Sequence, residues 1–147
     1  MASAATEASV TIELDLPTSP VELSFDRDRV VEALRNLLWN AQEAMAPVGG
    51  VVRVRLRREP RSAVIEVEDG GRGIEDPTAP VFDPFYTTKP SGTGLGLSVA
   101  HRVATDHGGS ITFRSRPGRT VFRLELPVEV QVDSKRVPPA GGTREPA

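Results

Sequence analysis

Two carboxamides and two carboxylates recur at helical spacing in the first half of the chain. Successive members are four, four and three residues apart, so on a helix they share one face: Glu32, Asn36, Asn40 and Glu43. Oxygen ligands of this kind suit Mg²⁺, which usually shares its shell with water and nucleotide phosphates. A solvated polar face is the alternative. Asparagine is a poor helix former, however, so two of them in mid-helix need a reason.

A glycine-rich run, residues 91–98 with the sequence SGTGLGLS, precedes a second apolar helical segment. A helix N-terminus favours anions, so the backbone N–H groups beside these glycines are free to meet phosphate oxygens. By itself the run is a weak signal, because a flexible loop before a helix has the same composition.

Asp69 occupies a third position suited to binding. Residues 64–69 alternate as a strand, and the chain turns at the glycines that follow. From the end of a strand, a carboxylate can accept a hydrogen bond from an exocyclic amine such as that of adenine. An ordinary Asp-Gly turn is the alternative.

An aromatic cluster, residues 81–90 with the sequence VFDPFYTTKP, ends in a lone cation, Lys89, just before the glycine-rich run. We expect Phe82 and Phe85 to anchor one end of a mobile flap whose other end is that run. A hydrophobic satellite cluster under a long loop is the alternative.

Two helices and a sheet must position these residues. The first helix is predicted to follow a capping Asp26 or Asp28 and to end near Pro47, and its core-facing stripe would be Val30, Leu34, Leu38, Ala41 and Met45. The second helix is predicted over residues 94–107, after a long lid loop at 70–93. Strands are predicted over residues 9–16, 21–25, 51–58, 63–69, 110–116 and 120–126. This order predicts an α+β fold, a two-layer α/β sandwich with one mixed β-sheet and helices on one face.

Length and composition agree with one domain in the 147 residues. We expect residues 9–127 to form it, between a disordered lead at 1–8 and a disordered tail or linker at 128–147. No apolar run approaches the roughly 18–20 residues of a membrane span, and the absence of cysteine favours the cytoplasm.

The charge balance gives no sign of nucleic-acid binding, since 18 basic side chains face 20 acidic ones. Four arginines do cluster in the predicted strand 51–58. Because the strand alternates, we expect them to form its solvated face: Arg53, Arg55, Arg57 and Arg58.

In order and type, these four motifs resemble those of the ATP-binding catalytic domain of bacterial sensor histidine kinases. That domain belongs to the superfamily shared with gyrase, the heat-shock chaperone ATPases and the mismatch-repair ATPases, and the resemblance covers about residues 10–127. Residues 36–44 resemble the asparagine box, 69–74 the first glycine box, 82–85 the phenylalanine box and 92–97 the second glycine box. The sequence FYTTKP at 85–90 is most similar to the nitrogen-regulation class of these kinases. The resemblance implies a Bergerat-type ATP-binding fold.

Carried over position by position, the resemblance implies that Asn40 ligates Mg²⁺ and that Asn36 lies near the γ-phosphoryl group. Asp69 would bind the adenine amine, and Lys89 is the best-placed lid cation for the γ-phosphate. The remaining implied contacts with ATP are Glu43, Gly71, Gly73, Gly92, Thr93, Gly94, Leu95, Gly96, Leu97 and Thr120.

Three departures from the family pattern stand in the sequence. The first glycine box begins Asp-Gly-Gly where the family usually has Asp-Asn-Gly, the segment 75–81 is short and holds two prolines, and one glycine is missing before Thr120. None removes a residue implied to touch Mg²⁺ or phosphate.

Asn36 separates the functional alternatives. In the superfamily's hydrolases the matching residue is usually a glutamate, which can take a proton from water, whereas a carboxamide cannot. Phosphoryl transfer depends mainly on positioning and charge stabilisation, so Asn36 favours transfer to a protein residue over hydrolysis. Glu32 and Glu43 are the carboxylates that we consider as candidates to assist the transfer.

The acceptor of such a transfer is expected outside this sequence. His101 falls inside the second helix and His107 at its end, where structural roles are predicted. The resemblance therefore implies a histidine on a dimerising helical hairpin, in another chain or a parent protein, and a response regulator downstream. We expect the isolated domain to be a monomer. The alternative is a stand-alone nucleotide-binding interaction module, or a serine kinase of the anti-sigma type.

Overall fold

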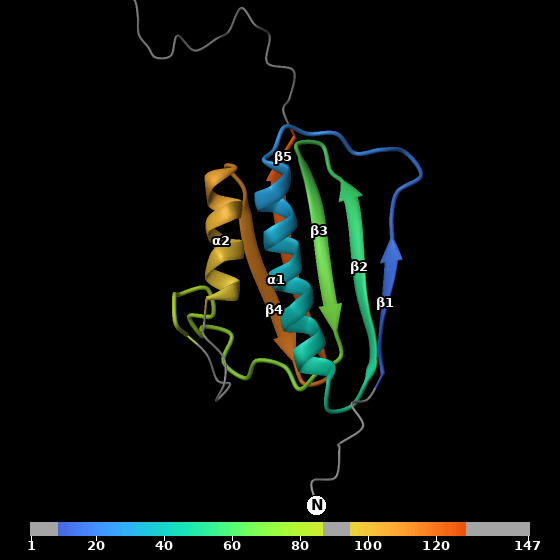
Figure 1. The fold of residues 1–147 in the computed structure, drawn as a ribbon, viewed down its shortest axis with the longest axis vertical. Helices are drawn as coiled ribbons and strands as arrows, with labels where there is room; N and C mark the ends of the chain where they lie inside the picture. The colour runs from blue at the N-terminus through green and yellow to red at the C-terminus, as the bar shows by residue number, and fades with distance from the viewer. Residues whose placement is uncertain (1–8, 87–94, 129–147) are drawn as a thin grey trace, which may run out of the picture.

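The computed structural model describes residues 9–86 and 95–128. Their helices and strands are, in chain order, β1 (Val10–Asp15), α1 (Arg27–Met45), β2 (Gly50–Arg58), β3 (Ser62–Asp69), α2 (Gly96–Asp106), β4 (Ser110–Arg116) and β5 (Arg119–Pro127). The strands form one sheet in the order β1-β2-β3-β5-β4. Only the β1–β2 pair among them is parallel, and both helices cover the same face (Figure 1). The predicted α+β sandwich with a mixed sheet is confirmed.

Helix α1 begins where the sequence provides a cap. Of the two aspartates considered, Asp26 is the cap, because its side chain accepts a hydrogen bond from Arg29 N at 3.2 Å. The helix ends at Met45, two residues before Pro47, which cannot continue it.

The buried stripe of α1 is turned slightly from the predicted one. Val30, Ala41 and Met45 are buried as expected, but the other two buried positions are Ala33 and Leu37. The predicted Leu34 and Leu38 are only half-buried, and pack against the edge of the core. Ala33 is fully buried at the centre of the stripe, and the larger Leu34 and Leu38 lie on its flank.

The predicted strand at 21–25 is wrong. Residues 16–26 contain no strand, although Leu23 packs against the core. The alternation at Val21 and Leu23 thus reflects burial of single side chains on the domain rather than pairing with another strand.

Helices α1 and α2 run antiparallel and are fastened at one end. His107 Nδ1 is 2.8 Å from Val103 O, and His107 Nε2 accepts a hydrogen bond from Asp26 N at 2.9 Å. Arg29 and Asp106 form an ion pair at 2.7 Å beside it. Both ring nitrogens of His107 therefore hold the fold, which agrees with the structural role predicted for it.

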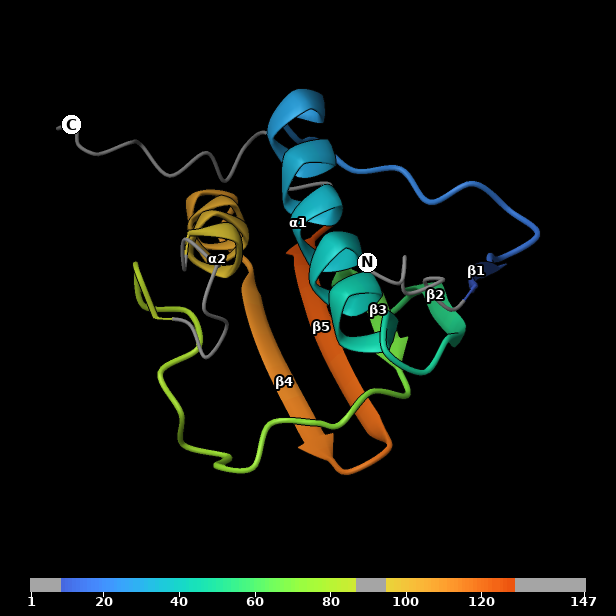
Figure 2. The same ribbon diagram turned by 60° about the horizontal axis from the view of Figure 1, so that its bottom comes forward.

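The other end of the helix pair is where the first glycine loop passes. Figure 2 shows residues 70–86 running from the end of β3 past the end of β4 to the side of α2. Val128, which the sequence places at the start of the tail, is buried and donates its N–H to Arg61 O. Neither helix in the described ranges has the length and apolar character needed to cross a membrane.

Candidate functional site

Asp69 and Thr120 lie directly opposite each other where β3 ends beside β5. Both point to the helix-covered side and are buried, at 2% and 4% exposure. Asp69 Oδ1 accepts a hydrogen bond from Gly71 N at 2.9 Å. A buried carboxylate needs such donors because burial without them is costly. Asp69, which the resemblance assigns to adenine, and Thr120, a further implied contact with ATP, thus share one buried corner.

Gly71 has no room for a side chain. A Cβ there would lie 2.8 Å from Ala44 O and 2.9 Å from Ala44 Cβ, on the last turn of α1. Its carbonyl accepts a hydrogen bond from Gly118 N at 2.9 Å. The first glycine loop is therefore pressed between α1 and the turn of the β4–β5 hairpin.

Gly73 is required for a second reason. Its φ is +86°, which L side chains rarely adopt, and a Cβ would lie 2.6 Å from Arg116 O. Gly71 and Gly73, both implied contacts with ATP, are thus in positions that only glycine fits.

Ser115 completes this corner and was missed by the sequence reasoning. Its hydroxyl accepts a hydrogen bond from Ile74 N at 2.6 Å and is 2.7 Å from Thr120 Oγ1. It thereby ties the glycine loop to the residue opposite Asp69. A signal was present, because Ser115 follows Ile111 and Phe113 at every second position of β4, and a polar residue on the core-facing side of a strand needs a partner.

The polar row on α1, which includes Asn36, Asn40 and Glu43, lies between this corner and the start of α2. A Cβ on Gly96 would be 3.2 Å from Asn36 Oδ1, whereas Gly71 abuts Ala44. Asn36 and Ala44 are eight positions apart, or about 12 Å along a helix. Asn40 lies between them, Asn36 and Asn40 are half-buried, and Glu43 is exposed. The structure therefore brings Gly71 of the first glycine box and Gly96 of the second to the asparagine helix.

Helix α2 begins in this region, because its first residue, Gly96, lies beside Asn36. Its N-cap is Leu95, which makes no side-chain cap hydrogen bond, and the Ser98 hydroxyl donates to Leu95 O at 2.8 Å. A helix N-terminus whose cap residue carries no side-chain acceptor suits an anionic ligand. The side chain of Leu97 packs on the core, so only its backbone is available to contact a ligand.

Phe82 anchors the loop, and Phe85 does not. The Phe82 ring stacks on His101, with ring centroids 5.4 Å apart, and meets Phe113 and Phe122 edge-on at 6.1 Å each. Phe85 is 74% exposed and has a φ of 69°, so the expectation that it anchors the flap is wrong.

The metal assignment rests on a single protein ligand. No group of three or more His, Cys, Asp or Glu residues within 9–86 and 95–128 could hold a metal ion. Mg²⁺ suits this donor set only if phosphates and waters fill most of its shell, which is its usual behaviour. Four predicted contacts lie outside the described residues: Lys89, Gly92, Thr93 and Gly94.

Known proteins are similar to this chain in sequence and in fold. Residues 25–130 match the family described as Histidine kinase-, DNA gyrase B-, and HSP90-like ATPase. The sensory histidine kinase/phosphatase NtrB of Azospirillum brasilense is 36% identical over 133 residues, covering 79% of this chain and 33% of NtrB. The sensor histidine kinase ZraS of Escherichia coli K12 is 40% identical over 111 residues, covering 74% of this chain and 24% of ZraS. The solved catalytic domain of histidine kinase ThkA gives a TM-score of 0.71 at 30% identity, covering 81% of this chain and 80% of that one.

The chain therefore belongs to the histidine kinase-, DNA gyrase B- and HSP90-like ATPase family, as its four motifs predict. Within that family it is a catalytic ATP-binding domain like those of NtrB, ZraS and ThkA. It spans about a third of the length of NtrB and a quarter of that of ZraS.

Proposed function

We propose that this domain binds ATP with Mg²⁺ and transfers the γ-phosphoryl group to a histidine on a dimerisation domain outside this sequence. The observation that carries the proposal is that one residue of each glycine box meets α1, with Gly96 against Asn36 and Gly71 against Ala44. A ligand that spans this length would meet the buried carboxylate of Asp69 at one end and the N-terminus of α2 at the other.

Each end of the site fits one part of the nucleotide. Asp69 would accept a hydrogen bond from the adenine amine, with Thr120 beside it. The N–H groups at the start of α2 would meet phosphate oxygens, together with Lys89 and Gly92–Gly94 of the lid. Bound Mg²⁺, held by Asn40, would neutralise charge on the phosphates.

Asn36 favours transfer over hydrolysis. Its carboxamide can orient a phosphate oxygen, but it cannot take a proton from water. In the transfer, a neutral imidazole nitrogen attacks the γ-phosphorus while the bond to the β-phosphate oxygen breaks, leaving ADP.

Neither histidine of this chain serves as the acceptor. His101 stacks on Phe82, and both ring nitrogens of His107 are engaged in hydrogen bonds. A histidine supplied by a helical hairpin, and a response regulator that receives the phosphoryl group in turn, complete the proposal. Because the domain would use cellular ATP, the proposal includes that it works in the cytoplasm.

Calorimetric titration with a non-hydrolysable ATP analogue, with and without Mg²⁺, tests the site. We expect Asp69→Asn to weaken binding by at least about tenfold, because a charge-assisted hydrogen bond is worth roughly 1.5–3 kcal/mol. We expect Asn40→Ala to remove the dependence on Mg²⁺, while Gln42→Ala on the same helix changes neither. Absence of binding at millimolar nucleotide contradicts the proposal.

The transfer itself needs a second measurement. Incubation with labelled ATP and purified dimerisation hairpins should place acid-labile label on histidine. Acid-stable label on serine would instead support the anti-sigma type of kinase.

A further inference from the structure

The face of the sheet opposite the helices carries a ladder of arginines and carboxylates. On its β1–β3 half every basic side chain has an acidic partner on a neighbouring strand. Arg53 pairs with Glu13 at 3.3 Å, and Arg55 with Glu68 at 3.0 Å. Arg57 pairs with Glu66 at 2.8 Å. These three arginines form the solvated strand face that the sequence predicts, and their charges are balanced. The prediction is wrong for Arg58, which follows Arg57 directly and so lies on the other face of the strand, where it donates to Glu59 O.

On β5 the same carboxylates are shared further. Arg119 donates to Glu68 at 3.1 Å, and this hydrogen bond lowers the pKa of Glu68 more than its contact with Arg55 does. Arg123 contacts Glu59 at 3.2 Å and Glu66 at 3.9 Å. The acidic groups near β5 are thus already engaged.

Two arginines on β4 are left over. Arg114 and Arg116 are exposed, and no acidic side chain in 9–86 or 95–128 pairs with either of them. Arg116 lies directly opposite Arg119 in the β4–β5 register. Like charges placed opposite each other destabilise a sheet pair. A negatively charged group at this end of the ladder would offset the repulsion.

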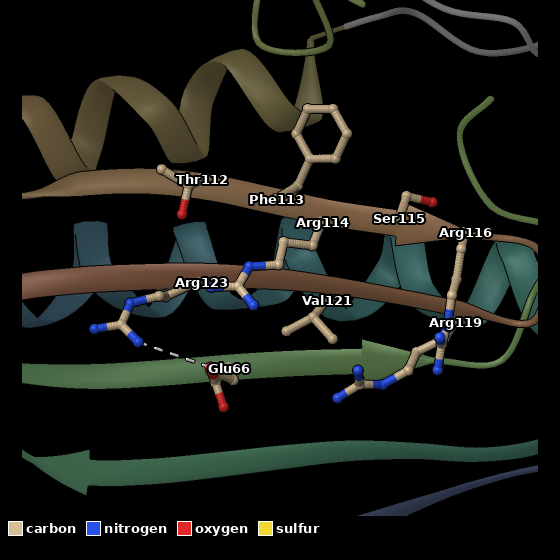
Figure 3. Close-up of a pocket in the computed structure, with 9 residues that line it drawn as sticks. All are labelled: Glu66, Thr112, Phe113, Arg114, Ser115, Arg116, Arg119, Val121 and Arg123. Carbon is tan, nitrogen blue, oxygen red and sulfur yellow. Dashed lines mark ion pairs between the residues drawn. The ribbon is translucent and has the colours of Figure 1, made fainter. Parts of the chain in front are cut away.

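These arginines border a groove of about 490 Å³ on the open face of the sheet. Figure 3 shows Arg114 lying over β5 beside Arg123, and Arg116 reaching toward Arg119, with Val121 between the two pairs. Four guanidinium groups therefore surround a small apolar floor, and Glu66 is the one acidic residue among the lining residues.

We propose that this groove binds an extended, acidic segment of a partner protein, with carboxylates at alternate positions. Arg114 and Arg116 are two residues apart on one strand, which sets a repeat of roughly 6.5–7 Å. Alternate residues of an extended peptide have the same repeat. Guanidinium groups bind carboxylates through two parallel hydrogen bonds, which gives such a segment a fixed register.

A nucleic acid fits this surface less well. Four glutamates, Glu59, Glu66, Glu68 and Glu125, stand in the same network and would repel a continuous run of phosphates. The net charge of the chain is −2, so long-range attraction of a polyanion is absent. The proposal does not depend on the proposed function, because the groove and the nucleotide corner lie on opposite faces of the sheet.

Fluorescence polarisation with a short labelled peptide that alternates glutamate and threonine tests the groove at low ionic strength. We expect saturable binding by the 147-residue chain, and a loss of at least about tenfold in Arg114→Ala/Arg116→Ala. The matched control is Arg27→Ala/Arg102→Ala, which removes the same charge from side chains that are 83% and 80% exposed on the helices. Circular dichroism and the urea midpoint of each variant establish that it is folded.

A peptide of the same composition with its glutamates in one block should bind more weakly. Equal losses in both double variants, or no binding of the alternating peptide, would overturn the proposal. Tighter binding of a DNA duplex than of the alternating peptide would also overturn it, in favour of a nucleic-acid surface.

Discussion

Gly96, the first residue of α2, lies against the side chain of Asn36 in the middle of α1. A Cβ on Gly96 would be 3.2 Å from Asn36 Oδ1, a tighter approach than most side chains make. The glycine thus leaves room for the carboxamide that the resemblance places near the phosphates.

Gly96→Ala is expected to raise the Kd for ATP by roughly three- to tenfold, about 0.7–1.4 kcal/mol, because the new methyl group displaces the Asn36 carboxamide. The free energy of unfolding without nucleotide should stay the same or rise by up to about 1 kcal/mol, since alanine is a better helix residue than glycine. Calorimetry and urea denaturation separate the two effects. A loss of stability as large as the loss of affinity would contradict this account.

Gly71→Ala and Gly70→Ala form a matched pair in the first glycine loop. A Cβ at Gly71 would clash with Ala44 at 2.8 Å, whereas one at Gly70 finds its nearest atom at 3.6 Å. We expect Gly71→Ala to cost about 1–3 kcal/mol of unfolding free energy, as overpacking does, and to weaken ATP binding. Gly70→Ala should unfold at a urea concentration close to that of the unchanged chain. Equal effects of the two substitutions would show that the contact with Ala44 does not matter.

Phe82→Ala and Phe85→Ala should differ in stability. Removal of the Phe82 ring loses contacts with three aromatic partners, and we expect a cost of roughly 2–3 kcal/mol, because the ring is only half-buried. Phe85 is 74% exposed, so its removal should stay within about 0.5 kcal/mol. Urea denaturation measures both. A large effect at Phe85 would mean that its ring packs against the domain in solution.

Glu68 should contribute to stability at neutral pH and lose this contribution in acid. Hydrogen bonds from Arg119 and Arg55 lower its pKa below the ordinary value of 4.5. The folded state then binds fewer protons than the unfolded state as the pH falls through this range, so the free energy of unfolding decreases.

The contribution is full above pH 4.5 and disappears as the pH drops through the lowered pKa. We expect Glu68→Gln to cost about 1 kcal/mol at pH 7 and to become equal to the unchanged chain in strong acid. Urea denaturation at a series of pH values measures this difference, and Glu22→Gln, exposed in the loop before α1, is the control. A cost independent of pH would rule out the ionic explanation.

Local signals predicted most of the fold. Asp26 and Pro47 frame α1 because one accepts from an exposed N–H group and the other cannot continue the helix. The predicted buried stripe of α1 was misplaced at Leu34 and Leu38, because a large leucine side chain gives a stronger hydrophobic signal than Ala33 does. How closely a helix approaches a sheet depends on tertiary packing, which one segment alone does not contain.

The site was predicted in its residue types more than in its geometry. Asp69 and Gly71 stand out locally, since a strand that ends in Asp-Gly-Gly must turn. That Thr120 lies opposite Asp69 depends on β5 pairing with β3, a contact between segments 51 positions apart in the chain. Ser115 was overlooked for the same reason, because its partners, Ile74 and Thr120, come from two other segments.

Strand β5 serves two surfaces in alternate residues. Thr120 faces the nucleotide corner, while Arg119, Val121 and Arg123 face the groove on the other side. Inserting or deleting one residue in this strand would exchange its faces, placing an arginine in the buried corner and a threonine in the groove. The two surfaces therefore depend on the same alternation of side chains along β5. A substitution can change one surface alone, but an insertion or deletion in the strand must change both.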